Sequence, residues 1–162
     1  MNNWENRPQE IAFLLNPAFC GRIIYTVVRQ YNLSSKQSFP FPLVYLILPL
    51  ILHKKTREKI SSRTKLLNWI QMNPDLLIGY AQRASNLIEI TNEAIEFLLQ
   101  TGIIKITDNA ELKINSKIKG LSKTKYIDNE IKDCLNKSEH VGKWFANTGK
   151  VETIYIGLGV RP

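Results

Sequence analysis

The stretch TNEAIEFLLQTGIIKITDNAELKIN, residues 91–115, decides the fold class. Apolar residues recur at helical spacing over 92–101, and Thr91 is placed to cap that helix. Two segments of alternating polarity, 103–107 and 111–115, then flank a short polar turn. This pattern predicts a helix followed by a β-hairpin.

Two shorter helices are expected before this stretch. Leu66, Leu67 and Ile70 mark a helix that ends near Met72, and Asn73-Pro74-Asp75 is a start signal for a helix that reaches about Leu87. Three helices followed by a hairpin indicate a winged helix-turn-helix over residues 64–116.

Residues 1–60 are expected to form a helical N-terminal part. Pro8 can open one helix, and Asn16 can cap a second that Pro17 begins and that buries one face through Gln30. The apolar stretch 39–52 should begin extended and continue as a buried, proline-kinked helix. It is shorter than the roughly 20 residues that a membrane-spanning helix needs, so no membrane partner is expected.

Residues 126–162 form the third part. Apolar residues at helical spacing predict a helix that Gly149 closes, and residues 151–160 are expected to be a β-rich tail. The sequence as a whole predicts a mainly α (α+β) fold in a single compact domain.

Composition points to a basic, cytoplasmic protein. The chain of 162 residues carries 22 Lys and Arg against 14 Asp and Glu, a net charge of +8, which favours an acidic or polyanionic partner. The N-terminus lacks the apolar run of a signal peptide. Cys20 and Cys134 have no companions at metal-ligand spacing and are expected to be reduced thiols in the core.

No catalytic constellation stands out in the sequence. A phosphate-binding loop of the G-x-x-x-x-G-K-[ST] type is absent, and Gly157-Leu158-Gly159 alone does not indicate a dinucleotide site. A nucleophile would require Cys20 to meet His53 or His140 in space, which sequence alone leaves open. We therefore expect a protein that is not an enzyme and that needs no cofactor or metal.

Basic residues gather in two groups that could neutralise phosphates. The candidate nucleic-acid-binding residues are Lys54, Lys55, Arg57, Lys59, Arg63 and Lys65 in the first group, and Lys117 and Lys119 in the second. A solubilising surface or an acidic protein partner would explain the same charges.

The helix before the hairpin carries carboxylates where a DNA-reading helix would offer basic or polar groups. Asn92, Glu93, Glu96 and Gln100 are expected on its exposed face. Carboxylates would meet phosphates at a cost, so Glu93 and Glu96 favour contact with a protein partner. Any DNA contact then falls to the flanking basic groups and is non-specific.

Several motifs together resemble a known family. These are WENRPxEIAxLLNPAFCG at residues 4–21, FPFPL at 39–43 and GVRP at 159–162, with supporting matches between them. They are similar to the middle component of bacterial three-component ABC-ATPase systems, relatives of Lamassu-type defence. The resemblance implies two partners, an SMC-like ABC ATPase and an effector that is often a nuclease, in a system that acts against phages and plasmids.

The two ends of the chain supply further candidates for partner contact. Trp4 and Arg7 lie near one end and Arg161 and Pro162 at the other, and Trp and Arg are enriched in interface hot spots. The alternative is internal, with Trp4 packed on the core and the arginines paired with nearby carboxylates.

These observations favour a non-catalytic adaptor that links the ATPase to the effector and helps to control its activation when DNA is sensed. Two alternatives stay open. One is a stand-alone winged-helix DNA-binding regulator, which would be a symmetric dimer with a preferred operator. The other is a cysteine-dependent hydrolase, which needs an exposed Cys20 with a lowered pKa.

Overall fold

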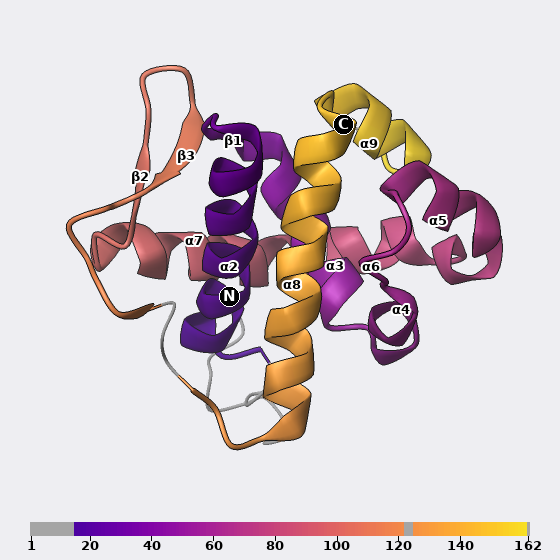
Figure 1. The fold of residues 1–162 in the computed structure, drawn as a ribbon, viewed down its shortest axis with the longest axis horizontal. Coiled ribbons are helices and arrows are strands. Elements are labelled where there is room, and N and C mark those ends of the chain that lie inside the picture. Colours follow the sequence, from indigo (N-terminus) through magenta and orange to yellow (C-terminus); the bar gives the residue numbers. More distant parts are fainter. Residues whose placement is uncertain (1–14, 122–124, 162) are drawn as a thin grey trace.

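The computed structural model describes residues 15–121 and 125–161 and is mainly helical, with one small sheet (Figure 1). Along the chain the elements are α2 (Pro17–Ser35), β1 (Phe39–Pro40), the 3-10 helix η2 (Phe41–Leu46), α3 (Ile47–Ile51), α4 (Lys54–Lys59), α5 (Leu66–Met72), the 3-10 helix η3 (Pro74–Leu77), α6 (Tyr80–Asn86), α7 (Ile88–Gln100), β2 (Ile104–Ile106), β3 (Glu111–Ile114), α8 (Asn129–Thr148) and α9 (Val151–Gly157).

The long helices α2 and α8 lie side by side and form the centre of the molecule (Figure 1). Gly142 of α8 permits their close approach, because a Cβ at this position would lie 2.7 Å from the carbonyl oxygen of Val27 in α2. Glycine lowers helix propensity, so Gly142 weakens the sequence signal for α8. The packing explains why it is nevertheless present.

Helix α2 begins as its sequence predicts and ends later. The Asn16 side chain accepts a hydrogen bond from the amide of Ala18 at 2.7 Å, and Pro17 is the first helical residue. The helix then continues past Gln30, the last residue of its predicted buried face, as far as Ser35, whose hydroxyl donates to the carbonyl of Tyr31. Lys36, in the left-handed region with φ of 61°, ends it.

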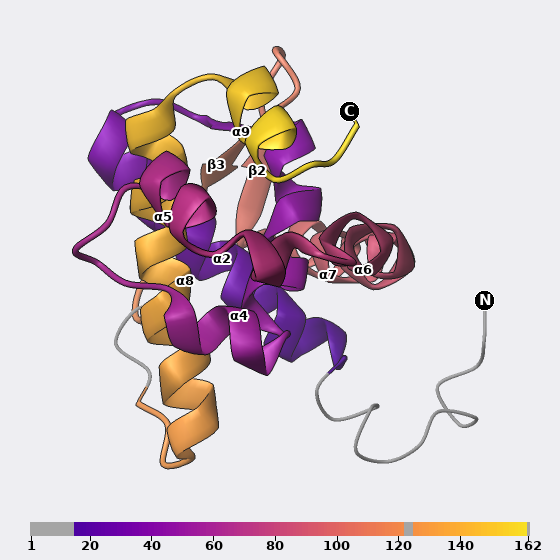
Figure 2. The same cartoon turned by 90° about the vertical axis from the view of Figure 1, so that its right-hand side faces the viewer.

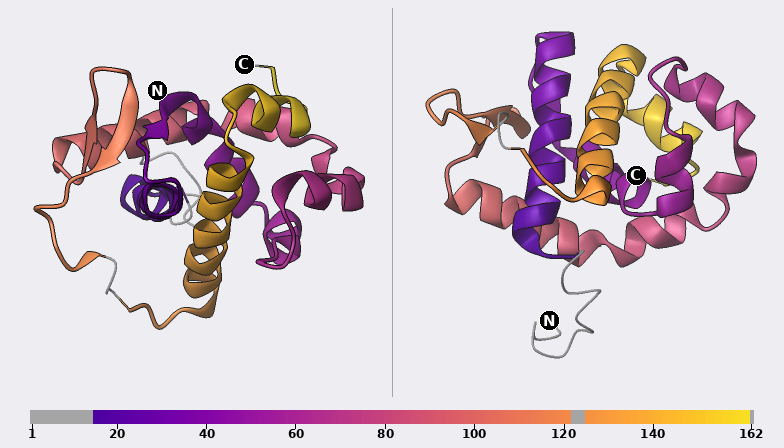
Figure 3. Two further views of the ribbon diagram at one scale, coloured as in Figure 1. Left: turned by 45° about the horizontal axis from the view of Figure 1, so that its top comes forward. Right: turned by 60° about the horizontal axis from the view of Figure 1, so that its bottom comes forward.

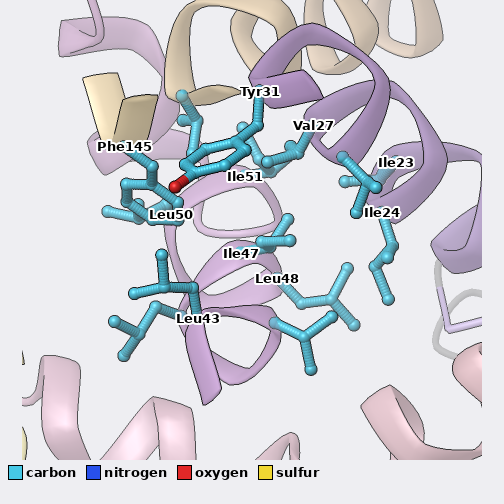
Figure 4. Packing of buried hydrophobic residues seen from close by; sticks show 14 of the residues in the cluster. Ile23, Ile24, Val27, Tyr31, Leu43, Ile47, Leu48, Leu50, Ile51 and Phe145 are labelled. Carbon is cyan, nitrogen blue, oxygen red and sulfur yellow. The ribbon is translucent and has the colours of Figure 1, made fainter. Parts of the chain in front are cut away.

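The apolar stretch after α2 forms the middle of the core, as expected. All five residues of α3 are buried, and they pack between α2 and Phe145 of α8 (Figure 4). The predicted helix is present from Phe41 to Ile51, its first half as the 3-10 helix η2 and its second half as α3. Leu43 and Val44 are buried in the first half.

The predicted hairpin is present as β2 and β3, and it gains a third strand from the N-terminal part. Strand β1 pairs antiparallel with β3, with Phe39 opposite Leu112, giving the order β1-β3-β2. Helix α2 also packs against β3. Sheet pairing and packing therefore cross the boundary that the sequence suggested between residues 1–60 and 64–116.

Four local predictions are wrong. Helix α7 begins at Ile88, so Thr91 lies inside it, fully buried, and does not cap it. The helix expected from Asn73 to Leu87 is divided into η3 and α6 by Gly79, which has a φ of 74°.

The other two corrections concern residues 53–65, where no helix is predicted, and the C-terminal tail. Residues Lys54–Lys59 form the helix α4, and the expected β tail is the helix α9. In α9 Ile154, Tyr155 and Leu158 are buried, which is a helical spacing rather than the alternation of a strand.

A single hydrophobic cluster contains residues from all three parts of the chain. Ile24 comes from α2, Leu98 from α7 and Ile154 from α9. In residues 15–121 and 125–161 no helix has both the length and the apolar character needed to cross a bilayer. The expected helix after Pro8, with Trp4 and Arg7, and the last residue, Pro162, lie outside the described residues.

Candidate interaction surfaces

Arg57 is buried, which corrects its prediction as a nucleic-acid-binding residue. It is 3% exposed, and three hydrogen bonds of 2.9 Å hold its guanidinium: Nε donates to Asp133 Oδ2, Nη2 to Glu130 Oε1 and Nη1 to the carbonyl of Ile51. The two carboxylates belong to α8, so Arg57 joins α4 to α8 and to the end of α3. A guanidinium held in this way cannot contact phosphates.

Five members of the first basic group stay at the surface. They are Lys54, Lys55, Lys59, Arg63 and Lys65, on α4 and the segment that follows it. Lys54 and Glu58 lie 3.9 Å apart as an exposed pair on α4, a contact that contributes little stability. The remaining positive charge faces solvent, and binding of nucleic acid by these residues stays a prediction.

The second basic group lies elsewhere on the molecule. Lys117 and Lys119 are exposed in the segment after β3, at the opposite end of the long axis from α4 (Figures 1 and 3). The structure therefore does not bring the two groups together into one surface.

Helix α7 presents a polar face. Asn92 is exposed and its Oδ1 accepts a hydrogen bond from the Tyr45 hydroxyl at 2.8 Å, and Glu96 accepts one from Gln100 Nε2 at 3.0 Å. Glu93 is half-buried. Glu96 is thus accessible to a partner, whereas Glu93 is only partly so, and their role in a protein interface stays a prediction.

An apolar groove of about 570 Å³ opens between α6, the start of α7, η2 and the C-terminal segment after α9. Figure 2 shows α6 and α7 nearly end-on, with the segment after α9 above them. The residues that line the groove are Tyr45, Leu46, Ala81, Ala84, Ser85, Ile88, Tyr155, Gly159, Val160 and Arg161.

The polar atoms of the two groove tyrosines already have partners in the chain. The Tyr45 hydroxyl donates to Asn92, and the Tyr155 hydroxyl donates to the carbonyl of Pro42. Both tyrosines therefore present mainly ring carbon to the groove. Ser85 and Arg161 supply its remaining polar side chains.

Arg161 lies at this groove, exposed and without an ion pair to any residue in the described part of the chain. The sequence marked Arg161 as a candidate for partner contact but did not reveal the groove. Its lining comes from three stretches far apart in sequence, residues 45–46, 81–88 and 155–161. The one available signal was the spacing of Ala81, Ala84, Ser85 and Ile88, at i, i+3, i+4 and i+7.

The cysteines are buried thiols. Cys20 is 0% exposed and Cys134 is 1% exposed, and burial raises the pKa of Cys134 to about 11. The hydrolase alternative required an exposed Cys20, so the structure contradicts it. Residues 15–121 and 125–161 contain no group of three His, Cys, Asp or Glu side chains that could hold a metal ion.

A family model for the ABC-three component (ABC-3C) system Middle Component 3 matches residues 4–162. The chain belongs to this family. The resemblance inferred from the terminal motifs is thereby confirmed. The match to the middle component extends over both ends of the chain, including Trp4, Arg7 and Arg161. No curated protein and no solved structure gives a significant match.

Proposed function

We propose that this middle component is a non-catalytic adaptor that joins the ABC ATPase of its system to an effector protein. The observation that carries the proposal is the family match, which spans nearly the whole chain. We further propose that the ATPase is SMC-like, that the effector is a nuclease, and that the assembly acts in the cytoplasm against phages and plasmids.

The distribution of surfaces supports an adaptor. The apolar groove lies beside α6 and α9, whereas the polar face of α7 and the basic side of α4 are built from other residues. A subunit with separate surfaces can contact two partners at once. Such a subunit can shift the effector between its inactive and active states only by as much as its affinity for these two states differs.

We also propose that the hairpin and α7 form a winged helix, assembled differently from the sequence expectation. In this arrangement α2 supplies the first helix and β1 the first strand, and α7 directly precedes β2 and β3. Support comes from the packing of α7 and β3 on α2 and from the pairing of β1 with β3. The acidic face of α7 favours protein contact over base reading.

Co-expression tests the adaptor proposal. The tagged middle component is produced with the ATPase and the third component of its own system, and the mass of the purified assembly is determined. We expect one assembly that contains all three proteins. Purification of the middle component alone, as a dimer that prefers one DNA sequence, would contradict the adaptor proposal and support the stand-alone regulator.

A second experiment tests non-specific DNA contact by the basic residues near α4. Fluorescence anisotropy with duplexes of unrelated sequence compares Lys54→Glu/Lys59→Glu with Lys117→Glu/Lys119→Glu in the assembly. Because each phosphate contact releases counterions, we expect the first variant to weaken binding and to reduce its salt dependence. A loss confined to the second variant would place the contact in the segment after β3, and no loss in either variant would exclude both groups.

A further inference from the structure

We propose that the groove between α6, α7 and the C-terminal segment receives an amphipathic helix from another component of the system, one that carries an acidic side chain opposite Arg161. This inference rests on the proposed adaptor function. It goes beyond that function by stating where one interface lies on the molecule and which kind of segment binds there.

The first argument is the shape of the groove. Ala81, Ala84 and Ser85 lie on one face of α6, and Ile88 continues that face at the start of α7. Small side chains let the axis of a second helix come close, and the spacing i, i+3, i+4 and i+7 matches the contact face of a helix. None of the lining residues lies in a strand, so an extended partner would find no sheet edge to pair with.

The second argument is the scarcity of polar groups. A pocket for a small molecule contains convergent donors and acceptors that fix the orientation of its ligand. Here the hydroxyls of Tyr45 and Tyr155 are engaged by Asn92 and by the carbonyl of Pro42. The surface that is left is suited to aliphatic side chains. Ile88, with 43% of its surface exposed, would be covered by such a partner.

The third argument is charge. Arg161 has no acidic partner in the described part of the chain, and it stands at an otherwise apolar groove. A carboxylate on the incoming helix would form a charge-assisted pair with its guanidinium, which fixes orientation as well as adding affinity. Arginine beside an apolar pocket is also a common composition of interface hot spots.

Paired variants in the co-expressed assembly test the proposal. Ala81→Trp fills the groove from an exposed position, and Gln82→Trp places the same side chain on the neighbouring residue, which does not line the groove. Arg161→Glu reverses the charge at the groove, Arg161→Lys keeps it, and Lys150→Glu reverses an exposed charge at the start of α9. Thermal unfolding of each purified variant confirms that it is folded.

Of the two other components of the assembly, we expect one to bind about tenfold or more weakly to both Ala81→Trp and Arg161→Glu, and the other to bind both variants as before. Gln82→Trp and Lys150→Glu should bind nearly as the wild type does. Arg161→Lys keeps the charge but not the guanidinium geometry, and it should lose less binding than Arg161→Glu. Crosslinking from position 81 should then recover a helical, acidic segment of the lost component.

Two other results would overturn the groove proposal by itself. One is an Ala81→Trp variant that binds both other components as tightly as the wild-type chain does. The other is a small apolar molecule retained by the purified chain in native mass spectrometry. If the wild-type chain assembles with neither component, the adaptor function fails, and the groove proposal fails with it.

Discussion

Two regions of the molecule each contain one arginine: Arg57 lies at the junction between α4 and α8, and Arg161 lies at the groove beside α6. The two side chains differ in exposure and in the groups that they contact. Arg57 is 3% exposed and donates to two carboxylates and one carbonyl. Arg161 is exposed and has no ion pair in the described part of the chain. The first arginine stabilises the fold, whereas the second is available to a partner.

Small residues show the same contrast. Gly142 on α8 faces α2, whose backbone fills the space that a side chain would occupy. Ala81 and Ala84 on α6 line a groove, and in the described part of the chain no helix packs into it as α2 packs onto Gly142. A small residue therefore marks a close helix contact in one region and the wall of a groove in the other.

The largest effect on stability is expected from Arg57→Ala. The substitution removes one buried and two partly buried hydrogen bonds, and it leaves Glu130 and Asp133, which are about half exposed, with water as their partner. Because these carboxylates can be hydrated, we expect a loss of about 2–3 kcal/mol, below the usual cost of an uncompensated buried charge. Urea denaturation measures it, with Lys59→Ala on the exposed face of α4 as the control. Equal stability of the two variants would show that Arg57 is not a structural residue.

Gly142→Ala is expected to have the next largest effect. The new Cβ would meet the Val27 carbonyl at 2.7 Å, so α2 and α8 must separate. The gain in helix propensity offsets only part of this cost, and we expect a net loss of about 1–2 kcal/mol. Asn136→Ala, at an exposed position of the same helix, is the control and should change stability little. A stabilised Gly142→Ala variant would mean that the helices are not in close contact there.

A smaller effect is expected from pH. Burial lowers the pKa of His53, with the charges of Arg83 and Lys55 acting in the same direction. Burial also lowers the pKa of His140, with Lys143 and Lys137 adding to it. The unfolded chain then binds protons at a higher pH than the folded chain does, so the free energy of unfolding falls as the pH drops below about 6.5.

Urea titrations at pH 7.5 and 5.5 measure this change. The variant His53→Gln/His140→Gln should lose much of it, since it lacks both titrating groups. An unchanged pH dependence in the double variant would assign the effect to other residues.

The smallest effect on stability is expected from Arg161→Ala, in contrast to Arg57→Ala. An exposed residue without an ion pair should change the free energy of unfolding by less than about 0.5 kcal/mol. Calorimetry of the isolated chain measures this change, and binding to the co-expressed components measures function separately. A large loss of stability would show that Arg161 supports the fold and is not reserved for a partner.

Local signals in the sequence were read correctly where the cause is local. Asn16 and Pro17 begin α2 because a cap and a fixed φ act within a few residues. Gly149 adopts a positive φ at the end of α8, where the sequence predicts that this helix stops. The hairpin of β2 and β3 likewise follows from alternation around a short turn.

Expectations failed where distant residues decide the outcome. Thr91 was a plausible cap, but buried contacts extend α7 by one turn toward Ile88. Arg57 was one cation among six in sequence, and only the approach of α8 supplied its two carboxylates. The tail after Gly149 became helical because one of its faces is buried in the core.

Motifs, caps and apolar periodicity act over short distances, so the family, the mainly helical class and the position of most helices can be predicted from the sequence. That β1 completes the sheet, that Arg57 is internal and that a groove lies beside Arg161 depends on tertiary packing. Each of these features joins segments separated by many residues. Their contacts depend on how whole helices pack, and no local pattern encodes that packing.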